Sequence, residues 1–330
     1  MLEMHSHAQK SKLSLAVALA IGAFPAISAE FDMGGGKLIA KGSVYFGGVI
    51  RADKRDPELI ASANALLVGA ASTNIGGKNQ DDGNLNYARN DVVSETLKGY
   101  LDLEYKRNDF GIVLRGKAWT DFKLKNGNVP WGNVPNGFVA DRTLSDTGAL
   151  PRSKFSGVVA EDIYLYGRSG LGGGSLNWKV GNQKFDWGTR FSTAGGLNDL
   201  TPRDLPGGRR AGALPEEGLI PVPAVTLRFN PTTTTTIDAF YQVRFRRNAP
   251  NGCGTFFSQL DFVSEGCDKA FLGNVSDRAT LASGTLIKRA DTVSPSNSGQ
   301  FGFGFKQQVA SLGAELGIYA AQFHSRVAYY

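Results

Sequence analysis

The sequence of 330 residues contains very little histidine. His5 and His7 lie within the first ten residues, so His324 is the only histidine in the rest of the chain. One imidazole cannot build a histidine-rich metal site, and a serine, histidine and aspartate triad would have to use that residue. We therefore predict a protein that is not an enzyme and needs no cofactor. A hydrolase built on His324 is the alternative.

Long hydrophobic runs are also missing, and no stretch reaches the roughly 18 apolar residues of a membrane-spanning helix. The apolar run LSLAVALAIGAF follows Lys10 and Lys12 and precedes the small residues of PAISAE. That order is typical of a secretory signal. We predict that residues 1–29 are a signal peptide and that the mature protein lies outside the cytoplasm. An N-terminal membrane anchor is the alternative.

Cysteine is scarce as well, with Cys253 and Cys267 the only two in the chain. Two thiols alone do not make a zinc site, and an exported protein meets oxidising conditions. We predict a disulfide between them. The nearby acidic residues Asp261, Glu265 and Asp268 do not have the EF-hand spacing, so we interpret them as part of a solvated loop rim. A calcium site is the alternative.

Charge of one sign is not concentrated anywhere. The formal net charge is +6 from 36 basic and 30 acidic residues, spread along the chain. Nucleic-acid binding needs a basic patch, so we predict no nucleic-acid partner. With 42% hydrophobic residues the chain is too apolar for disorder, and its 42 glycines suit a turn-rich β protein.

Strand patterns dominate what is present. The segment TIDAFYQVRFRR at 236–247 alternates apolar and polar residues. LKGYLDLEYKR at 97–107 likewise has its leucines and Tyr105 on one face and its charged residues Lys98, Asp102, Glu104 and Lys106 on the other. Runs of this kind predict nine strands, at 37–50, 96–106, 111–124, 161–168, 175–186, 223–229, 236–246, 300–306 and 310–323.

The connections between these runs alternate between long and short. Outer-membrane barrels have long extracellular loops and short periplasmic turns, with apolar side chains toward lipid and polar side chains toward the lumen. We predict that residues 30–330 form an antiparallel transmembrane β-barrel. A periplasmic sandwich is the alternative. Because nine is an odd number, we expect an N-terminal portion of a larger barrel, unless a strand has been miscounted.

A ring of basic side chains would make a lumen selective for anions. We predict a constriction in which strand residues face a long loop that folds inward, although acidic residues on the same strands count against a simple anion pore. The candidate residues are Arg115, Lys117, Arg203, Arg209, Arg210, Arg244 and Arg246.

Several segments carry a family resemblance, in this order along the chain: VGNQKFDWGTR, GLNDLTPRDLPGG, PVPAVTLRF, DAFYQVRF, CGTFFSQLDFVSEGCD and AELGIYAAQFHSR. Together they resemble the Gram-negative envelope family called domain of unknown function 1302, over nearly all of residues 36–330. The resemblance implies a longer outer-membrane barrel with channel or export roles, often encoded beside a lipoprotein-like partner and an inner-membrane pump.

We therefore expect a channel or export component of the Gram-negative outer membrane that passes a small amphiphilic or anionic molecule. A plugged surface-binding or structural barrel is the alternative. Such a location implies contact with outer-membrane lipid, lipopolysaccharide and the barrel-assembly machinery.

Overall fold

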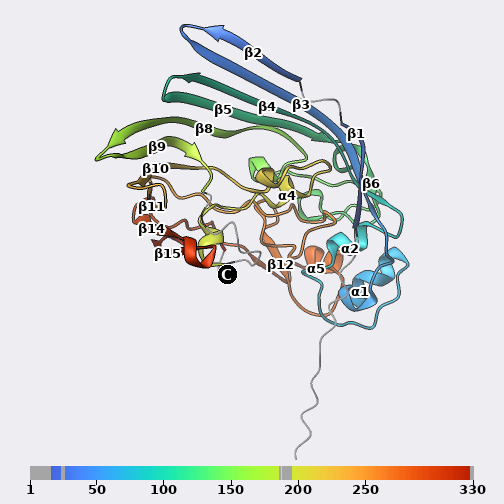
Figure 1. Ribbon diagram of the computed structural model, residues 1–330. Coiled ribbons are helices and arrows are strands. Elements are labelled where there is room, and N and C mark those ends of the chain that lie inside the picture. Colours follow the sequence, from blue (N-terminus) through green and yellow to red (C-terminus); the bar gives the residue numbers. More distant parts are fainter. Residues whose placement is uncertain (1–15, 24–26, 186, 188–194, 328–330) are drawn as a thin grey trace, which may run out of the picture.

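The computed structural model describes residues 16–23, 27–185, 187 and 195–327. One antiparallel sheet of eleven strands dominates the fold, in the order β1-β3-β4-β5-β8-β9-β10-β11-β14-β15, with β2 paired to β3. Figure 1 shows this sheet curving around the segment that contains α4. Its strands are β1 (Ala16–Ala23), β2 (Ile27–Met33), β3 (Gly36–Arg51), β4 (Val92–Arg107), β5 (Phe110–Asp121), β8 (Ser156–Leu171), β9 (Gly174–Gln183), β10 (Val222–Asn230), β11 (Thr235–Gln242), β14 (Gln300–Val309) and β15 (Ala314–Gln322).

The predicted all-β antiparallel fold is confirmed, and each of the nine predicted strands overlaps an observed one. Within the described residues no strand pairing joins β15 to β1 or β2, so the sheet is an open arc there. The sequence pattern predicts no strand before residue 37. β1 and β2 lie there, and β1 falls inside the predicted signal peptide, whose cleavage stays a prediction.

Several predicted strand boundaries are wrong, since residues 122–124 lie in a short helix and 310–312 in a 3-10 turn. One boundary error changes the placement of candidate residues. The strand expected over 236–246 ends at Gln242, because β10 and β14 pair with β11 only as far as that residue. Arg244 and Arg246 therefore lie beyond the strand rather than on its face. No helix in the described part of the chain has the length and apolar content needed to cross a bilayer.

The two faces of the sheet differ in an unusual way. On one face, here called the apolar face, large hydrophobic side chains are open to the surroundings: Leu101 is 50% exposed, Phe303 60% and Ile318 63%. On the opposite, polar face, Lys98 and Lys117 are buried. A globular protein in water hides the first kind of residue and exposes the second.

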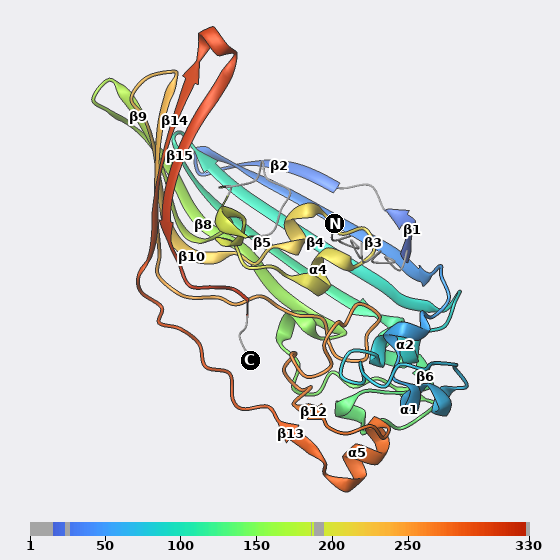
Figure 2. The ribbon, with the colours of Figure 1, turned by 90° about the horizontal axis from the view of Figure 1, so that it is seen from below.

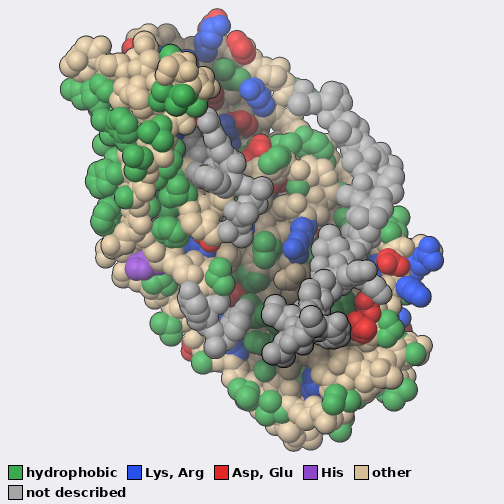
Figure 3. Space-filling model, turned by 60° about the horizontal axis from the view of Figure 1, so that its bottom comes forward, with side chains coloured by type: hydrophobic (Ala, Val, Ile, Leu, Met, Phe, Trp, Pro, Cys, Tyr) green, Lys and Arg blue, Asp and Glu red, His purple; other side chains and the backbone are tan. Residues whose placement is uncertain are grey.

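Figure 3 shows hydrophobic side chains gathered along the left side of the molecule. β14 and β15 lie on this side in Figure 2. Charged side chains also lie nearer the middle of the view in Figure 3.

The connections follow the predicted alternation. Short turns join β4 to β5, β8 to β9, β10 to β11 and β14 to β15, and in the second of these Gly172 and Gly173 both have a positive φ, as a tight hairpin turn requires. The long connections at 52–91, 122–155 and 243–299 gather at the other end of the strands (Figure 2). We call this assembly the cap.

The cap is built from short elements. They are η1 (Pro57–Leu59), α1 (Ser62–Ala65), η2 (Leu66–Val68), α2 (Asp82–Asn86), α3 (Phe122–Asn126), β6 (Asn128–Val129), η3 (Val134–Asn136), β7 (Arg142–Thr143), η4 (Pro151–Ser153), β12 (Lys269–Phe271), α5 (Asp277–Ser283) and β13 (Leu286–Lys288). Two hydrophobic clusters hold these elements together. Trp131 and Phe138 belong to one cluster, and Tyr87 and Phe155 to the other.

The predicted disulfide between Cys253 and Cys267 is confirmed, and both residues are buried in the cap. Replacing both cysteines by alanine is expected to lower the free energy of unfolding of the cap by about 3 kcal/mol, because the bond closes a loop of about 15 residues in the unfolded chain. Denaturant unfolding with and without dithiothreitol measures this difference. Equal midpoints for the oxidised protein and the double variant would contradict it.

Candidate functional site

The polar face of the sheet carries a buried cluster of charges at the level where a loop folds onto it. The loop, residues 195–221, contains η5 (Gly196–Asp199), α4 (Leu205–Arg209) and η6 (Pro215–Gly218), and we call it the inner loop. Figure 1 shows α4 on the concave side of the sheet. This loop contains Arg209 and is the basic loop predicted to fold inward, and it lies on the concave side of the sheet.

Lys117 on β5 is the centre of this cluster. Its Nζ lies 3.2 Å from Glu161 Oε1 on β8, 3.2 Å from Asp204 Oδ2 and 3.9 Å from Glu217 Oε2, with the last two carboxylates in the inner loop. All of these side chains have at most 1% of their surface exposed. The three carboxylates compensate the charge of the buried ammonium group. Because two of them belong to the inner loop, these ion pairs hold the inner loop against the sheet.

A second lysine, on the neighbouring strand β4, also connects the sheet to the inner loop. Lys98 on β4 places its Nζ 2.6 Å from Glu217 Oε1 and donates a hydrogen bond to the Gly212 carbonyl at 2.8 Å. Arg152, from η4 of the cap, donates to Glu161 at 2.7 Å and to Asp204 at 3.0 Å. The inner loop is therefore held from two strands and from the cap.

A β-bulge in β8 supplies two of the acidic groups. Ile163 pairs with Leu114 and Ala160 with Gly116, so Glu161 and Asp162 together oppose the single residue Arg115. Both carboxylates then point to the polar face, where Lys184 contacts each of them, at 3.3 Å and 3.4 Å. Arg115 is shared between Asp102 at 3.0 Å and Asp162 at 3.5 Å.

The local sequence of the inner loop explains its tight fold. Asp204 Oδ1 accepts a hydrogen bond from the Gly207 amide at 2.8 Å and so caps α4. A Cβ atom at Gly207 would lie 2.5 Å from the Asp204 carboxyl carbon and 2.7 Å from the Glu217 carbonyl oxygen. Only glycine fits this close approach, and the DLPGG segment is therefore a structural requirement of the site.

The basic residues predicted for a constriction lie in different environments. Arg210 lies 4.0 Å above the Trp119 ring, and burial lowers its pKa to about 10. Arg209 lies 4.9 Å above the Phe257 ring, and Arg203 lies 4.0 Å from Asp199. Of the predicted residues, Arg115 and Lys117 belong to one network of ion pairs on the polar face, whereas the described ion pairs do not include the others in it.

The charges of this network balance. Its cations are Lys98, Arg115, Lys117, Arg152 and Lys184, and its carboxylates are Asp102, Glu161, Asp162, Asp204 and Glu217. The polar face therefore carries a network of paired cations and carboxylates, most of them buried. A ring of unpaired cations selecting anions stays a prediction, and Arg244 is the exposed member of the predicted set that lies past β11.

The acidic residues considered for calcium do not converge. Glu265 pairs with Arg247 and Arg289, and Asp268 pairs with Lys269 at 2.6 Å. Asp261 is buried beside Asp82, whose amide donates to its Oδ2 at 3.4 Å.

His324 contacts two residues of the connection between β11 and β14. Its Nε2 lies 3.3 Å from Ser296 Oγ and 3.2 Å from the Ser298 carbonyl oxygen. A hydrogen bond to that carbonyl requires a proton on Nε2, because a carbonyl oxygen only accepts. Within the described residues no carboxylate hydrogen-bonds to His324.

Comparison with known proteins gives a family and no closer relative. A family model described as "Protein of unknown function (DUF1302)" matches residues 10–330. No curated protein matches the chain, and no solved structure does either.

Proposed function

Because the chain belongs to the DUF1302 family, whose description assigns no activity, we propose a function from the geometry: the chain contributes the wall of an outer-membrane β-barrel that passes a small molecule. The inner loop constricts the lumen of this barrel. The transport involves no covalent chemistry.

The observation that carries this proposal is the inverted polarity of the sheet. Leu101, Phe303 and Ile318 are exposed on the apolar face, while Lys117 and Glu161 are buried on the polar face. Exposed hydrophobic residues that continue across many strands exceed what a protein surface in water tolerates. In a bilayer the same residues face hydrocarbon, and the polar face lines a lumen.

The two ends of the strands support the same orientation. Short turns occupy one end and the cap occupies the other (Figure 2). In outer-membrane barrels the short turns are periplasmic and the long loops are extracellular. The disulfide in the cap fits a location outside the reducing cytoplasm.

The balanced network narrows the class of cargo. The inner wall carries paired cations and carboxylates rather than charge of one sign, and Phe240 on the same face belongs to a buried hydrophobic cluster with Phe185. Such a wall suits a small amphiphilic molecule. An anion remains the second cargo class, because Arg244 is an exposed cation past the end of β11.

A plugged surface-binding barrel is the second candidate function, favoured by one specific observation. The inner loop is tied to the sheet through fully buried ion pairs, and such a loop can close a lumen permanently. In that case the cap, rather than the lumen, would carry the function.

Single-channel recording in a planar bilayer separates the two candidates. A channel is expected to give stepwise currents with the wild-type protein, and a plugged barrel is expected to give none until the inner loop is released. Glu217→Gln weakens the contacts to Lys98 and Lys117 and is the releasing variant. Glu58→Gln, at an exposed cap position, is the control and is expected to behave as wild type. Absence of currents from the wild type would contradict the channel, and currents only from Glu217→Gln would support the plugged barrel.

A further inference from the structure

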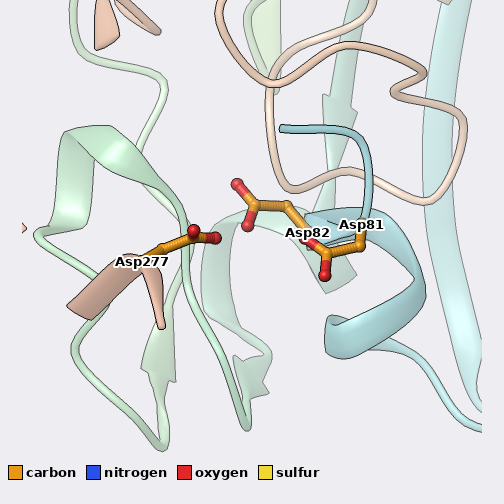
Figure 4. A group of neighbouring side chains, drawn as sticks. All are labelled: Asp81, Asp82 and Asp277. Atoms are coloured by element: carbon orange, nitrogen blue, oxygen red, sulfur yellow. The ribbon is translucent and has the colours of Figure 1, made fainter. Parts of the chain in front are cut away.

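Four aspartates are buried together in the cap, away from the inner loop. Asp81 and Asp82 lie at the start of α2, Asp277 begins α5, and Asp261 comes from the connection between β11 and β14. Each is at most 1% exposed. One carboxylate oxygen from each of Asp81, Asp82 and Asp277 lies within 4.8 Å of the other two (Figure 4).

Several oxygens of this group lack a donor. Asp82 Oδ1 accepts from Trp131 Nε1 at 2.7 Å, and Asp277 Oδ2 accepts from Asn64 Nδ2 at 2.8 Å. The second oxygens, Asp82 Oδ2 and Asp277 Oδ1, and also Asp261 Oδ1, are buried and accept no hydrogen bond from the described residues. Buried oxygens of a carboxylate are rarely left without a partner, so three in one cluster require an explanation.

The surrounding charges do not provide that explanation. Lys78 is the nearby cation, but its Nζ is held by the carbonyls of Leu272, Gly273 and Val275 and by Thr280 Oγ1, at 2.9 to 3.1 Å. Burial and the charge of Asp81 raise the pKa of Asp277 to about 8, and burial raises the pKa of Asp81 to about 6.

The strongest charges acting on Asp82 are the other three aspartates. Lys78 interacts electrostatically with Asp277 and Asp81, so the four acidic groups outnumber the cation beside them.

We propose that this cluster binds a calcium ion. All of its candidate ligands are carboxylate oxygens. Hard cations such as Ca²⁺ prefer these oxygens to soft sulfur ligands. At the Ca²⁺–oxygen distance of about 2.3–2.6 Å, ligands on opposite sides of the ion are about 4.6–5.2 Å apart, so oxygens within 4.8 Å of one another can share one ion. Mg²⁺, at about 2.0–2.1 Å, needs a tighter arrangement.

The ion would join parts of the cap that are far apart in sequence. Asn64 already links the two sides, because its Nδ2 donates to Asp81 and Asp277 and its Oδ1 accepts from the Asp277 amide at 2.9 Å. A bound Ca²⁺ would make the connection between β3 and β4 and the connection between β11 and β14 one unit. This inference goes beyond the proposed function and holds whether the lumen is open or plugged.

Trp131 provides a direct probe, because its indole touches Asp82 and can sensitise Tb³⁺, a luminescent substitute for Ca²⁺. The purified full chain is titrated with Tb³⁺ under tryptophan excitation, and Ca²⁺ is then added. We expect saturable emission that Ca²⁺ displaces at or below about 1 mM, the range of extracellular calcium sites, and that Mg²⁺ displaces far less well. No saturable emission, or equal displacement by Mg²⁺, would overturn the calcium assignment.

Variants locate the ion. Asp277→Asn and Asp82→Asn keep the shape of the side chain and remove one ligand charge, and each is expected to weaken Tb³⁺ binding by at least about tenfold. Asp268→Asn, at a half-exposed aspartate of the same connection that pairs with Lys269, is the matched control and should bind as wild type. Circular dichroism of each variant shows whether it is folded. Equal binding by a folded Asp277→Asn variant and by Asp268→Asn would refute the site.

Discussion

Leu101→Arg is expected to destabilise the protein by about 2–4 kcal/mol when it is folded in lipid vesicles, the cost of arginine near the middle of a bilayer. Leu101 lies near the middle of β4 on the apolar face and is 50% exposed. In water, such a substitution at an exposed position usually changes stability by at most about 0.5 kcal/mol. The two environments therefore predict clearly different results, and urea unfolding of the vesicle-bound protein measures them.

Two controls make this experiment specific. Phe110→Arg changes the same face at the turn end of β5, where the cost is expected to fall to about 0–1 kcal/mol because the position is near the membrane surface. Leu66→Arg changes a cap residue that is 78% exposed and should have little effect. If Leu101→Arg costs no more than Leu66→Arg, the apolar face does not contact lipid and the membrane proposal fails.

Lys117→Met is expected to lower the free energy of unfolding by about 3–5 kcal/mol, the effect of removing one partner of a buried ion pair. Methionine keeps most of the side-chain volume, so the loss comes from the charge. Glu161, Asp204 and Glu217 would lose their common cation while remaining buried. Under the channel proposal the inner loop also loosens, and we expect a larger or noisier single-channel current.

A second substitution tests this explanation. Asp204→Asn in the Lys117→Met background removes one of the uncompensated carboxylates and should recover part of the lost stability. Lys37→Met is the control, because Lys37 and Glu30 form an exposed pair at 3.6 Å, and such pairs contribute at most about 1 kcal/mol. A loss for Lys117→Met no greater than that for Lys37→Met would show that the buried network does not hold the loop.

The strands were predictable because alternation is a local signal. In β4, Leu97 and Leu101 are exposed while Thr96 and Lys98 are buried, the arrangement that the alternating sequence predicts. β1 was missed because an apolar run such as AVALAIGA suits a signal peptide as well as a strand. The short helices of the cap, of four to seven residues, are too short to show a helical period.

Much of both charged clusters could not be predicted, since their members are far apart in the chain. Lys117 and Asp204 are 87 residues apart, and Asn64 and Asp277 are 213 apart. No spacing rule connects residues at such distances. The positions of Glu161 and Asp162 do have a signal in the sequence. Two adjacent acidic residues interrupt the alternation between Ala160 and Ile163. Such an interruption is what a bulge looks like in sequence.

That bulge changes the phase of β8. Before it, the even-numbered residues Val158 and Ala160 are exposed, whereas after it the odd-numbered Ile163 and Leu165 are. Neighbours along a regular strand point in opposite directions, so an unbroken strand never presents two adjacent carboxylates to one arginine. The concentration of charge opposite Arg115 is thus a property of the backbone path. Substitution alone, along a strand of constant phase, could not reproduce it.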